Sequence, residues 1–444
     1  MNLTAHMQAL LATALKNISP QAPKANAPRA EVSLDDVPPE LIHEILLLVP
    51  QPFILNFGLT SRKNYELCQR ALHYRIVLTH ENLSSLHFPK IARDDPALRW
   101  VKELKLGYQS DSGWDVLSDG SILTAFPNLR LLDALGHAPM RGWAGLLHVI
   151  DSLPSTMTHL SGNMYCTGDS HVWPTERTFP SYKSLLLTLK TEHYGLEDIV
   201  GHCAIPATLS ASFPCLVNLT MDLRFRLRDT SGFWNGCHFP ALRSFTLIRL
   251  PMAHEDGRAL ASLLSRHATT LREISFTEVS LPAEAALLFV HVACKPDHVC
   301  ACIHMAIILG QSPSLCSTLR TLHIISCFHG MTGIESVRVL PPCVLDVVHT
   351  LHVDMDAITE GALQLDDVSR LVPNIRAVTV HFRLTDSHKA AQALSHFKTQ
   401  QTFLWNCTAL EKIVLLPVEE ESSTFVLVRP PKGGLVKLRK IQRN

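Results

Sequence analysis

The sequence of 444 residues lacks an excess of either charge, a long apolar run and a dense set of cysteines. Its 40 Lys and Arg balance 40 Asp and Glu, which argues against a dedicated nucleic-acid binder with a large basic face. Apolar stretches such as Leu41–Val49 are far shorter than the roughly 18 residues of a transmembrane helix. Hydrophobic residues nevertheless make up 46% of the chain, enough to build a core, which excludes a wholly disordered protein.

The cysteines are also too dilute for a fold built on disulfides, and no Cys-x-x-Cys pair occurs to indicate a zinc ribbon or a thioredoxin-like motif. We interpret most of the thiols as buried, reduced core residues. The densest set of possible zinc ligands is His291, Cys294, His298, Cys300, Cys302 and His304. Its spacing matches no standard zinc module, so we predict no metal site and no cofactor.

Catalytic motifs are absent as well. The sequence contains no HExxH, GxSxG, GxxxxGK[ST] or GxGxxG pattern. The stretch Ser395–Lys398 matches SxxK, but without the partner motifs such a short match is expected by chance. We therefore predict that the protein is not an enzyme.

The chain divides into four regions by composition and pattern. Residues 1–30 contain no acidic side chain, as in a mitochondrial presequence, but their prolines favour a disordered leader over residues 1–31 instead of a targeting peptide. Residues 32–80 carry a helical pattern, and residues 98–418 are repetitive. Residues 419–444 are predicted to be a basic tail and a solvated end. We expect a cytoplasmic or nuclear protein.

The repetition is the strongest pattern in the sequence. Its unit is apolar-x-x-apolar-x-apolar, and we call the first apolar residue of each copy its anchor. The anchors are Val101, Leu129, Met157, Tyr182, Leu216, Leu242, Leu271, Leu319, Val348, Ile375 and Leu410. They lie mostly 25 to 35 residues apart, with one interval of 48. We interpret that overlong interval, around residues 282–315, as an inserted helix or an artefact of gene prediction.

Each unit combines a strand with a helix. The alternation that ends the unit predicts a short strand with one buried face. Stretches with helical spacing, such as Gly142–Leu153, Gly257–Arg266 and Lys389–Phe397, lie between the strands. One such pair cannot bury its apolar face alone, so stacked copies must share a continuous core. The sequence therefore predicts an α/β solenoid with parallel strands.

This pattern resembles leucine-rich repeats of 26–30 residues, and the resemblance implies a horseshoe. The Asn or Cys that this family places eight positions after the anchor is mostly missing. Cys327 fits, whereas Arg224, Leu250 and Arg383 stand at that position in other copies. We therefore expect an irregular leucine-rich-repeat solenoid.

Several polar residues are expected on the concave side of these repeats. His323 and His352 occupy the middle of predicted strands, and Asp354 and Arg383 lie near strand ends. These four are candidate contacts with a protein target, and half-buried filler is the alternative interpretation of the histidines.

The region before the repeats predicts three short helices. Pro38 and Pro39 suit the first turn of a helix, with Asp35 or Asp36 as its cap. The residues expected on one apolar face are Leu41, Ile45, Leu48 and Val49.

Pro50 and Pro52 are expected to end this helix, and further helices are expected over 53–61 and 63–72. Three helices in about 45 residues bury little surface alone, so much of the apolar face needs a partner.

This stretch resembles the F-box motif. The matching positions are Pro38, Glu40, Leu41, Ile45, Leu46, Leu55, Leu59, Ser61, Arg62, Leu72, Tyr74, Arg75 and Ile76. Val37 replaces the usual Leu, and Asn64 stands where the family has Trp or Phe. Together with the repeats, the pattern is similar to that of fungal F-box proteins with degenerate leucine-rich repeats.

The resemblance implies a substrate-recognition subunit of an SCF-type (cullin-RING) ubiquitin ligase. The module would dock on the Skp adaptor of the cullin complex through Pro38, Leu41, Ile42, Ile45, Leu46, Leu55 and Leu59. The repeats would bind an unknown protein substrate, with no nucleic acid and no membrane as partner. The alternative is a leucine-rich-repeat scaffold without a ligase role, in which the helical start only caps the first repeat.

Overall fold

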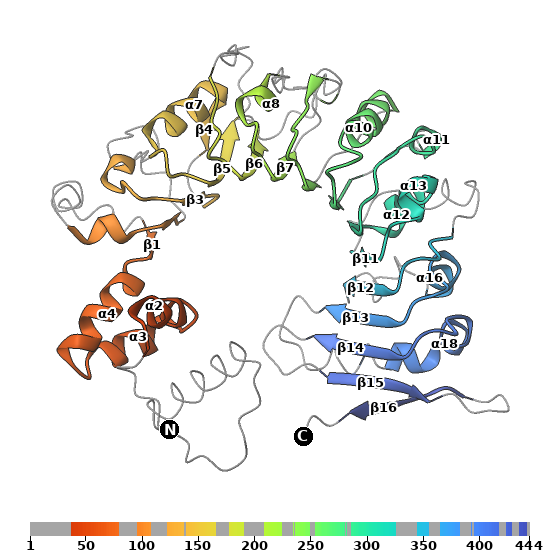
Figure 1. Ribbon diagram of the computed structural model, residues 1–444. Helices are drawn as coiled ribbons and strands as arrows, with labels where there is room; N and C mark the ends of the chain where they lie inside the picture. The colour runs from red at the N-terminus through yellow and green to blue at the C-terminus, as the bar shows by residue number, and fades with distance from the viewer. Residues whose placement is uncertain are drawn as a thin grey trace. The chain divides into compact units, whose positions relative to one another are not determined.

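The computed structural model describes residues 37–79, 96–107, 122–136, 139–165, 177–190, 208–223, 234, 236–248, 254–279, 281, 286–325, 344–354, 365–381, 392, 395–416, 423–428 and 435–441. The predicted leader, 1–31, lies outside these residues, as do Asp35, Asp36 and Arg383. The chain forms two compact units, one of residues 1–138 with 148–157 and the other of residues 139–147 with 158–444. Figure 1 shows their strands and helices.

The first unit begins with three helices: α2 (Pro39–Leu47), α3 (Gln51–Gly58) and α4 (Arg62–Leu72). Prolines stand at the start of α2 and of α3, where a missing N–H costs no hydrogen bond. The sequence had suggested that Pro52 ends α2. It lies instead in the first turn of α3. The N-cap of α2 is Pro38, which offers no side-chain cap.

The helices share a small core of Val37, Ile42, Leu46, Ile54, Phe57, Cys68 and Ala71. On α2 the buried residues are Ile42 and Leu46, four positions apart. The predicted apolar face of Leu41, Ile45, Leu48 and Val49 is not the side that packs into this core, because Leu41 and Leu48 are exposed. A helix of nine residues that is apolar on most sides leaves the pattern ambiguous, and packing against α4 selects the buried side.

Asn64 has a clear local role in this module. Its backbone N–H donates to Ser61 Oγ at 3.1 Å, which caps α4, and its Nδ2 donates to Thr60 Oγ1 at 2.8 Å. Thr60 Oγ1 in turn donates to the Phe57 carbonyl at 2.6 Å. Asn64, which departs from the F-box pattern, therefore closes the turn between α3 and α4 with hydrogen bonds.

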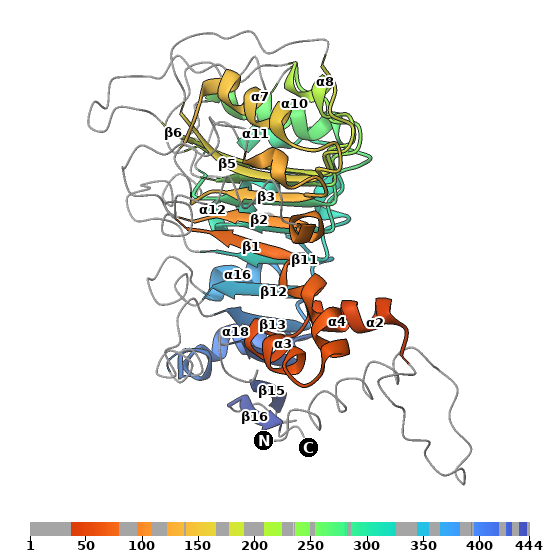
Figure 2. The same cartoon turned by 90° about the vertical axis from the view of Figure 1, so that its left-hand side faces the viewer.

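Strands follow directly after α4. They are β1 (Arg75–Leu78), β2 (Glu103–Leu106) and β3 (Leu131–Ala134), and the 3₁₀ helices η2 (Pro96–Trp100) and η3 (Leu123–Ala125) lie between them. The strands pair in parallel, with Ile76 opposite Leu104 and Leu104 opposite Leu132. Figure 2 shows them side by side. The sheet thus starts at Arg75, within the residues that were assigned to the helical module.

The second unit opens with β4 (Met140–Arg141), α7 (Gly142–Ser152), which runs on into the residues grouped with the first unit, β5 (His159–Tyr165) and β6 (Ser184–Lys190). Then come α8 (Leu209–Ser212), β7 (Asn218–Leu223), β8 (Ser244–Ile248), α10 (His254–Arg266), β9 (Glu273–Thr277), α11 (Ala286–Phe289) and β10 (His298–Ala301). The unit continues with α12 (Ile303–Leu309), α13 (Pro313–Cys316), β11 (Thr321–Ile324), β12 (Thr350–Asp354), α16 (Leu365–Leu371), β13 (Ala377–His381), α18 (Gln401–Asn406) and β14 (Lys412–Leu416). It closes with β15 (Ser423–Val428) and β16 (Lys437–Ile441).

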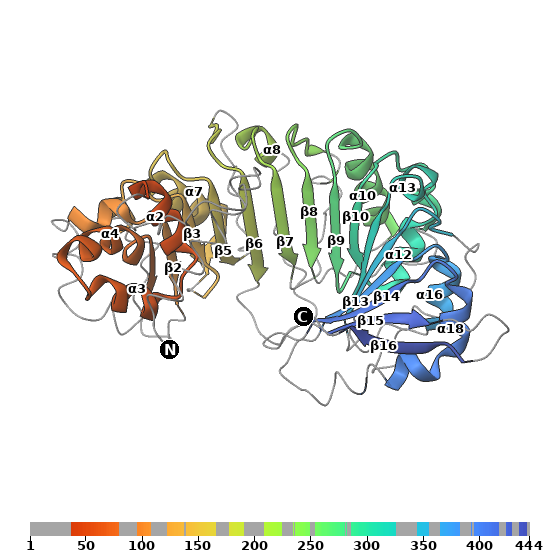
Figure 3. The same ribbon diagram turned by 60° about the horizontal axis from the view of Figure 1, so that its bottom comes forward.

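Strands β5 to β14 form a continuous parallel ladder, each pairing with the next in the chain. Within this unit the strands line the inner side of an arc and the helices lie on its outer side (Figures 1 and 3). We call the strand surface that faces away from the helices the open face. The predicted α/β solenoid of parallel strands is therefore confirmed.

The anchors account for the core of the repeats. All of those identified in the sequence are buried, including the weaker copies at Leu129 and Met157. Their strands alternate in the expected way; in β8, for example, Phe245 and Leu247 are buried while their neighbours are not. Burial of one strand face against the helices thus fixes the register from repeat to repeat.

The interpretation of the overlong interval is wrong. Strand β10 lies between β9 and β11, with His298 opposite both Glu273 and Thr321, so the strands are spaced 25 and 23 residues apart. Its anchor position holds Pro296, followed by Val299 and Ala301 at the two apolar positions of the pattern. The interval is thus two ordinary repeats, one of which has small or cyclic residues where the others have leucine.

Polar links join neighbouring repeats just before the strands. Asn128 Nδ2 donates to the Arg99 carbonyl and Asn374 Nδ2 to the Asp346 carbonyl, both at 2.8 Å. The hydroxyl of Thr318 donates similarly to the Pro296 carbonyl at 3.1 Å. These links connect consecutive turns through backbone carbonyls, the role that the expected Asn or Cys eight residues after the anchor would have had.

The predicted solvated tail is part of the sheet. Strands β15 and β16 pair antiparallel, and β15 also pairs antiparallel with β14. The side chain of Gln401 holds the backbone of Val436, whose N–H donates to Gln401 Oε1 at 2.9 Å. The hairpin covers the last parallel strand, which satisfies the hydrogen bonds of a strand that would otherwise be an open edge.

Candidate interaction surfaces

Four histidines gather on the open face of β10 to β13. Register places Cys300, His323 and His352 opposite one another on successive strands, and it places Asp354 opposite His381. The ring centroids of His323, His352 and His381 lie 5.1 to 5.8 Å apart. We call His298, His323, His352, His381, Cys300 and Asp354 the histidine cluster.

One member of the cluster is held as a cation. His323 Nε2 lies 3.0 Å from Asp354 Oδ1, and the Asp354 carboxylate is almost wholly buried. Burial by itself lowers the pKa of His323, but the hydrogen bonds with Asp354 and Cys300 outweigh it and raise the pKa to about 9. His323 and Asp354 therefore form an ion pair at neutral pH.

The other histidines are held neutral. His352 Nδ1 lies 2.8 Å from His381 Nε2, and the two rings stack at an interplanar angle of 27°. Only one proton fits between these nitrogens, because two N–H groups cannot face each other. Burial and the nearby His381 lower the pKa of His352 to about 4. Burial likewise lowers the pKa of His381 and of His298.

The cluster as a whole is therefore polar but close to neutral at pH 7. It combines one ion pair with three imidazoles that each offer a donor or an acceptor. Acidification adds positive charge to it, starting from the imidazoles. Such a surface can exchange hydrogen bonds with a protein partner, and its charge depends on pH.

The sequence identified part of this cluster. The structure brings His323, His352 and Asp354 together, as predicted, whereas Arg383 lies outside the described residues. His381 was missed, although it lies six residues after its anchor Ile375, the same offset that separates Asp354 from Val348. Cys300 was missed as an open-face residue because its repeat has no leucine at the anchor.

The possible zinc ligands do not converge on one point. His298 and Cys300 lie on the open face, while Cys294, Cys302 and His304 are buried on the helix side of β10. His304 Nε2 lies 3.2 Å from the Leu281 carbonyl. Throughout the part of the chain that the structure describes, no group of three or more His, Cys, Asp or Glu side chains is arranged to hold a metal ion.

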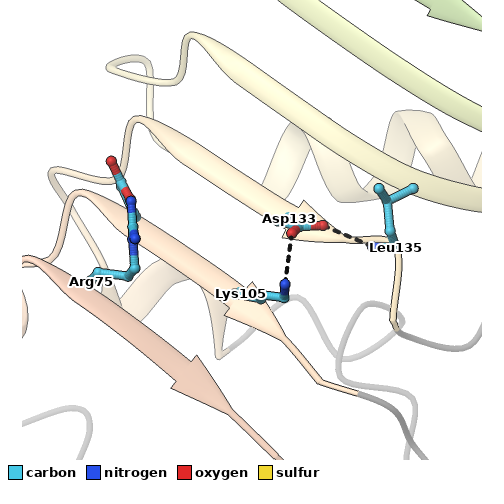
Figure 4. A network of polar contacts seen from close by, with 5 residues as sticks. Arg75, Lys105, Asp133 and Leu135 are labelled. Atoms are coloured by element: carbon cyan, nitrogen blue, oxygen red, sulfur yellow. Dashed lines mark hydrogen bonds and ion pairs between the residues drawn. The ribbon is translucent and has the colours of Figure 1, made fainter. Parts of the chain in front are cut away.

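In the first unit, the surface of β1 to β3 differs from the histidine cluster, because its charged side chains pair with one another. Arg75 on β1 is bonded to Glu103 on β2, and Lys105 Nζ lies 3.7 Å from Asp133 Oδ2 on β3 (Figure 4). Asp133 Oδ1 also accepts the Leu135 N–H at 3.2 Å. These cross-strand pairs join adjacent strands and leave little net charge for a partner.

The helical module carries the two most exposed large apolar side chains among the described residues. Leu48 is 86% exposed and Leu59 is 81% exposed. Leu41 on α2 lies two turns before Leu48, the C-cap of that helix, and Leu55 on α3 lies one turn before Leu59, the C-cap of α3. Each pair therefore shares a helix face. Phe53 and Tyr65 are about half exposed. We call Leu41, Leu48, Phe53, Leu55, Leu59 and Tyr65 the apolar surface.

The residues predicted to bind an adaptor divide by burial. Pro38, Leu41, Leu55 and Leu59 are exposed and Ile45 is partly buried. Ile42 and Leu46 lie in the core of the module, so they act through its fold and not through contact. The predicted list did not include Leu48, Phe53 and Tyr65, because a sequence pattern does not show which apolar side chains stay exposed after folding.

No protein-family model matches the chain, and no curated protein matches it. Solved structures do match it, two of them as follows. The leucine-rich repeat-containing protein LegL7 from Legionella pneumophila is 13% identical, with a TM-score of 0.38, over 73% of this chain and 98% of that one. A protein from Bacteroides fragilis is 10% identical, with a TM-score of 0.29, over 72% of this chain and 71% of that one.

No helix among the described residues is both long and apolar enough to cross a lipid bilayer.

Proposed function

We propose that this protein is a protein-interaction scaffold that acts as the substrate-recognition subunit of an SCF-type ubiquitin ligase. In this proposal the helical module binds the Skp adaptor of the cullin complex and the open face of the repeats binds a protein substrate. The ligase acts in the cytoplasm or the nucleus. The F-box resemblance of residues 37–76 suggests the adaptor, and the exposed apolar surface supports it.

The apolar surface is the observation that carries the proposal. Covering one leucine side chain contributes roughly 1.5–3 kcal/mol, so leaving Leu48 and Leu59 in water forgoes several kcal/mol that a partner would recover. Exposed apolar residues gathered on a small module indicate a protein contact more often than chance. Their pairing on α2 and α3 suits a partner that covers both helices.

The chemistry of ubiquitin transfer needs no residue of this chain. A scaffold that holds a substrate next to a conjugating enzyme converts a bimolecular encounter into an effectively intramolecular one. The proposed role is therefore non-catalytic, without cofactor, nucleic acid or membrane. Recognition would rest on the open face, where the histidine cluster offers hydrogen bonds.

The test is co-purification of the tagged full-length chain with the Skp adaptor from a cell lysate. We expect wild type to retain the adaptor and Leu59→Asp to lose it, since a carboxylate at this position cannot be buried against an apolar partner. Leu287→Asp is the matched control, because Leu287 is a 62% exposed leucine on α11, far along the chain. Both variants should keep the circular dichroism spectrum of wild type.

A scaffold without a ligase role is the second proposal, and one observation favours it. Helix α4 leads straight into β1, the first strand of its unit, as a capping module of the repeats would. In that case neither wild type nor either variant retains the adaptor. Loss of the adaptor from Leu287→Asp as well would mean that retention does not depend on the apolar surface.

A further inference from the structure

A row of basic side chains runs along the edge of the second unit where the strands begin. From β6 to β13, each repeat places one residue directly after its anchor, and the carbonyl of this residue accepts two N–H groups from the next repeat. For Arg243, for example, the donors are Arg272 N–H and Glu273 N–H at 2.8 and 2.9 Å. This ladder holds the successive positions at the spacing of neighbouring strands, about 4.8 Å. The residues at this position from β6 to β14 are Lys183, Val217, Arg243, Arg272, Asp297, Arg320, His349, Arg376 and Glu411.

Two of these arginines meet in a pocket of about 620 Å³. Arg243 and Arg272 line it from neighbouring repeats, together with Thr269 and Thr270. No carboxylate lines the pocket. Two arginines and two threonines thus line one cavity, and the side-chain charge of its lining residues is positive only.

A second pocket of about 410 Å³ continues from the first through the shared Arg272. Lys295 and Arg320 add two further cations, and Asp297 is the one carboxylate in its lining. Ser317 and Thr318 also line it. We call Arg243, Arg272, Lys295 and Arg320 the basic strip.

The charges of these four cations stand unpaired among the residues that the structure describes. Among the described residues, no carboxylate forms an ion pair with any of the four, and all four are exposed. Glu273 lies on β9 next to Arg272 but lines neither pocket. The whole chain has no net charge, so the positive charge here is a local concentration. Like charges at neighbouring strands repel, and a bound anion removes that repulsion.

We propose that the basic strip binds an extended, carboxylate-rich peptide segment of a protein partner. Arginine pairs well with the planar carboxylate through two parallel hydrogen bonds. The cations are spread over several strand spacings instead of converging on one point, which suits several carboxylates along an extended chain more than a single compact anion. This inference rests on the proposed role as a protein-interaction scaffold, but it requires neither the adaptor nor the histidine cluster.

The test is fluorescence anisotropy of a labelled peptide of alternating Glu and Gly, titrated with the full-length protein at about 50 mM salt. We expect Arg243→Gln combined with Arg272→Gln to weaken binding at least about tenfold, or about 1.4 kcal/mol, because the variant loses two bidentate charge contacts. The matched control is Lys183→Gln combined with Arg376→Gln. It removes the same charge from the same ladder position outside both pockets, and it should change the affinity less than about twofold.

A gain of affinity gives an independent check. Asp297→Asn removes the carboxylate of the second pocket and should strengthen peptide binding about twofold to fivefold. The proposal is overturned if wild type does not bind the peptide, or if the control variant loses as much affinity as the strip variant. It is also overturned if single-stranded DNA of equal charge binds more tightly and loses as much affinity in the strip variant. Adaptor retention by the strip variant separates this outcome from failure of the ligase proposal.

Discussion

The anchors of the repeats and two leucines of the helical module differ sharply in burial. Every anchor identified in the repeats is buried, whereas Leu48 and Leu59 in the module stand almost fully in water. Stacking gives each repeat a neighbour on both sides, so its apolar face is covered within the chain. Three short helices have too little volume to cover all their own apolar side chains. The module therefore has the two most exposed leucines among the described residues, although the repeats also expose single leucines such as Leu287.

The exposed residues of the two regions differ in kind as well. The module exposes aliphatic and aromatic side chains, while the open face of β10 to β13 carries half-buried imidazoles next to a buried carboxylate. Contacts made by the apolar surface should be nearly independent of pH and salt. Contacts made by the histidine cluster should depend on pH, since its charge changes between acid and neutral solution.

The largest expected effect compares a buried leucine with an exposed one. Leu322→Ala on β11 removes a fully buried side chain and should lower the free energy of unfolding by about 2–5 kcal/mol. Leu48→Ala should change it by less than about 0.5 kcal/mol. Urea denaturation followed by circular dichroism measures both. A large loss from Leu48→Ala would show that this side chain is packed in the folded protein and that the contrast does not hold.

The second prediction concerns the ion pair of the histidine cluster. Asp354→Asn removes the carboxylate that raises the pKa of His323, so that pKa should fall well below its value of about 9. The change should also cost about 2 kcal/mol of stability at neutral pH, the usual size for a hydrogen bond to a charged group. NMR titration of the His323 ring and urea denaturation check the two parts. A His323 that still titrates near pH 9 in the variant would contradict the assigned cause.

The pH dependence of stability should have two limbs. The pKa of His323 is raised in the folded state, so its contribution is complete below about pH 6.5 and is lost as the pH rises through about 9. The pKa of His352 is lowered to about 4, so the folded state loses stability as the pH falls from about 6.5 to about 4.

Thermal unfolding across this pH range measures both limbs. His352→Gln should flatten the acid limb, because the glutamine cannot take up a proton beside His298, His323 and His381. His291→Gln, at an exposed position after α11, is the control and should leave the acid limb as in wild type. Equal flattening by both substitutions would mean that the cluster does not govern the acid response.

The smallest expected effect tests the polar links between repeats. Asn374→Ala removes the bond from Asn374 Nδ2 to the Asp346 carbonyl and should cost about 1 kcal/mol. Asn128→Ala removes the equivalent link to the Arg99 carbonyl in the first unit and should cost a similar amount. Urea denaturation measures both. No change in either variant would show that these links do not join the repeats energetically.

The repeat pattern could be predicted because it repeats a local rule. A strand with one buried face requires alternation, and stacking requires that alternation at a fixed interval, so eleven anchors were visible in the sequence. Strand β10 was missed since Pro296 and Ala301 weaken that alternation. It forms a strand because β9 and β11 offer hydrogen-bond partners on both sides.

Two further features, the end of the chain and the packing side of α2, could not be predicted from the sequence for a related reason. The basic residues within 419–444 suggested a solvated end, but β14 would have been an open edge, and β15 and β16 cover it. On α2, leucine or isoleucine occupies nearly every side of the helix, so composition did not decide between Leu41 and Ile42 for the core. Packing against α4 decided it.

The sequence by itself determined the class of fold: parallel strands alternating with helices after a short helical module. This is so because apolar spacing is a local property of the chain. Only the tertiary structure decided which side chains meet. His323, Asp354 and His381 lie about 30 residues apart from one to the next, and Arg243 and Arg272 lie a whole repeat apart. They become neighbours through strand register, which pairs residues by backbone hydrogen bonds and not by proximity along the chain.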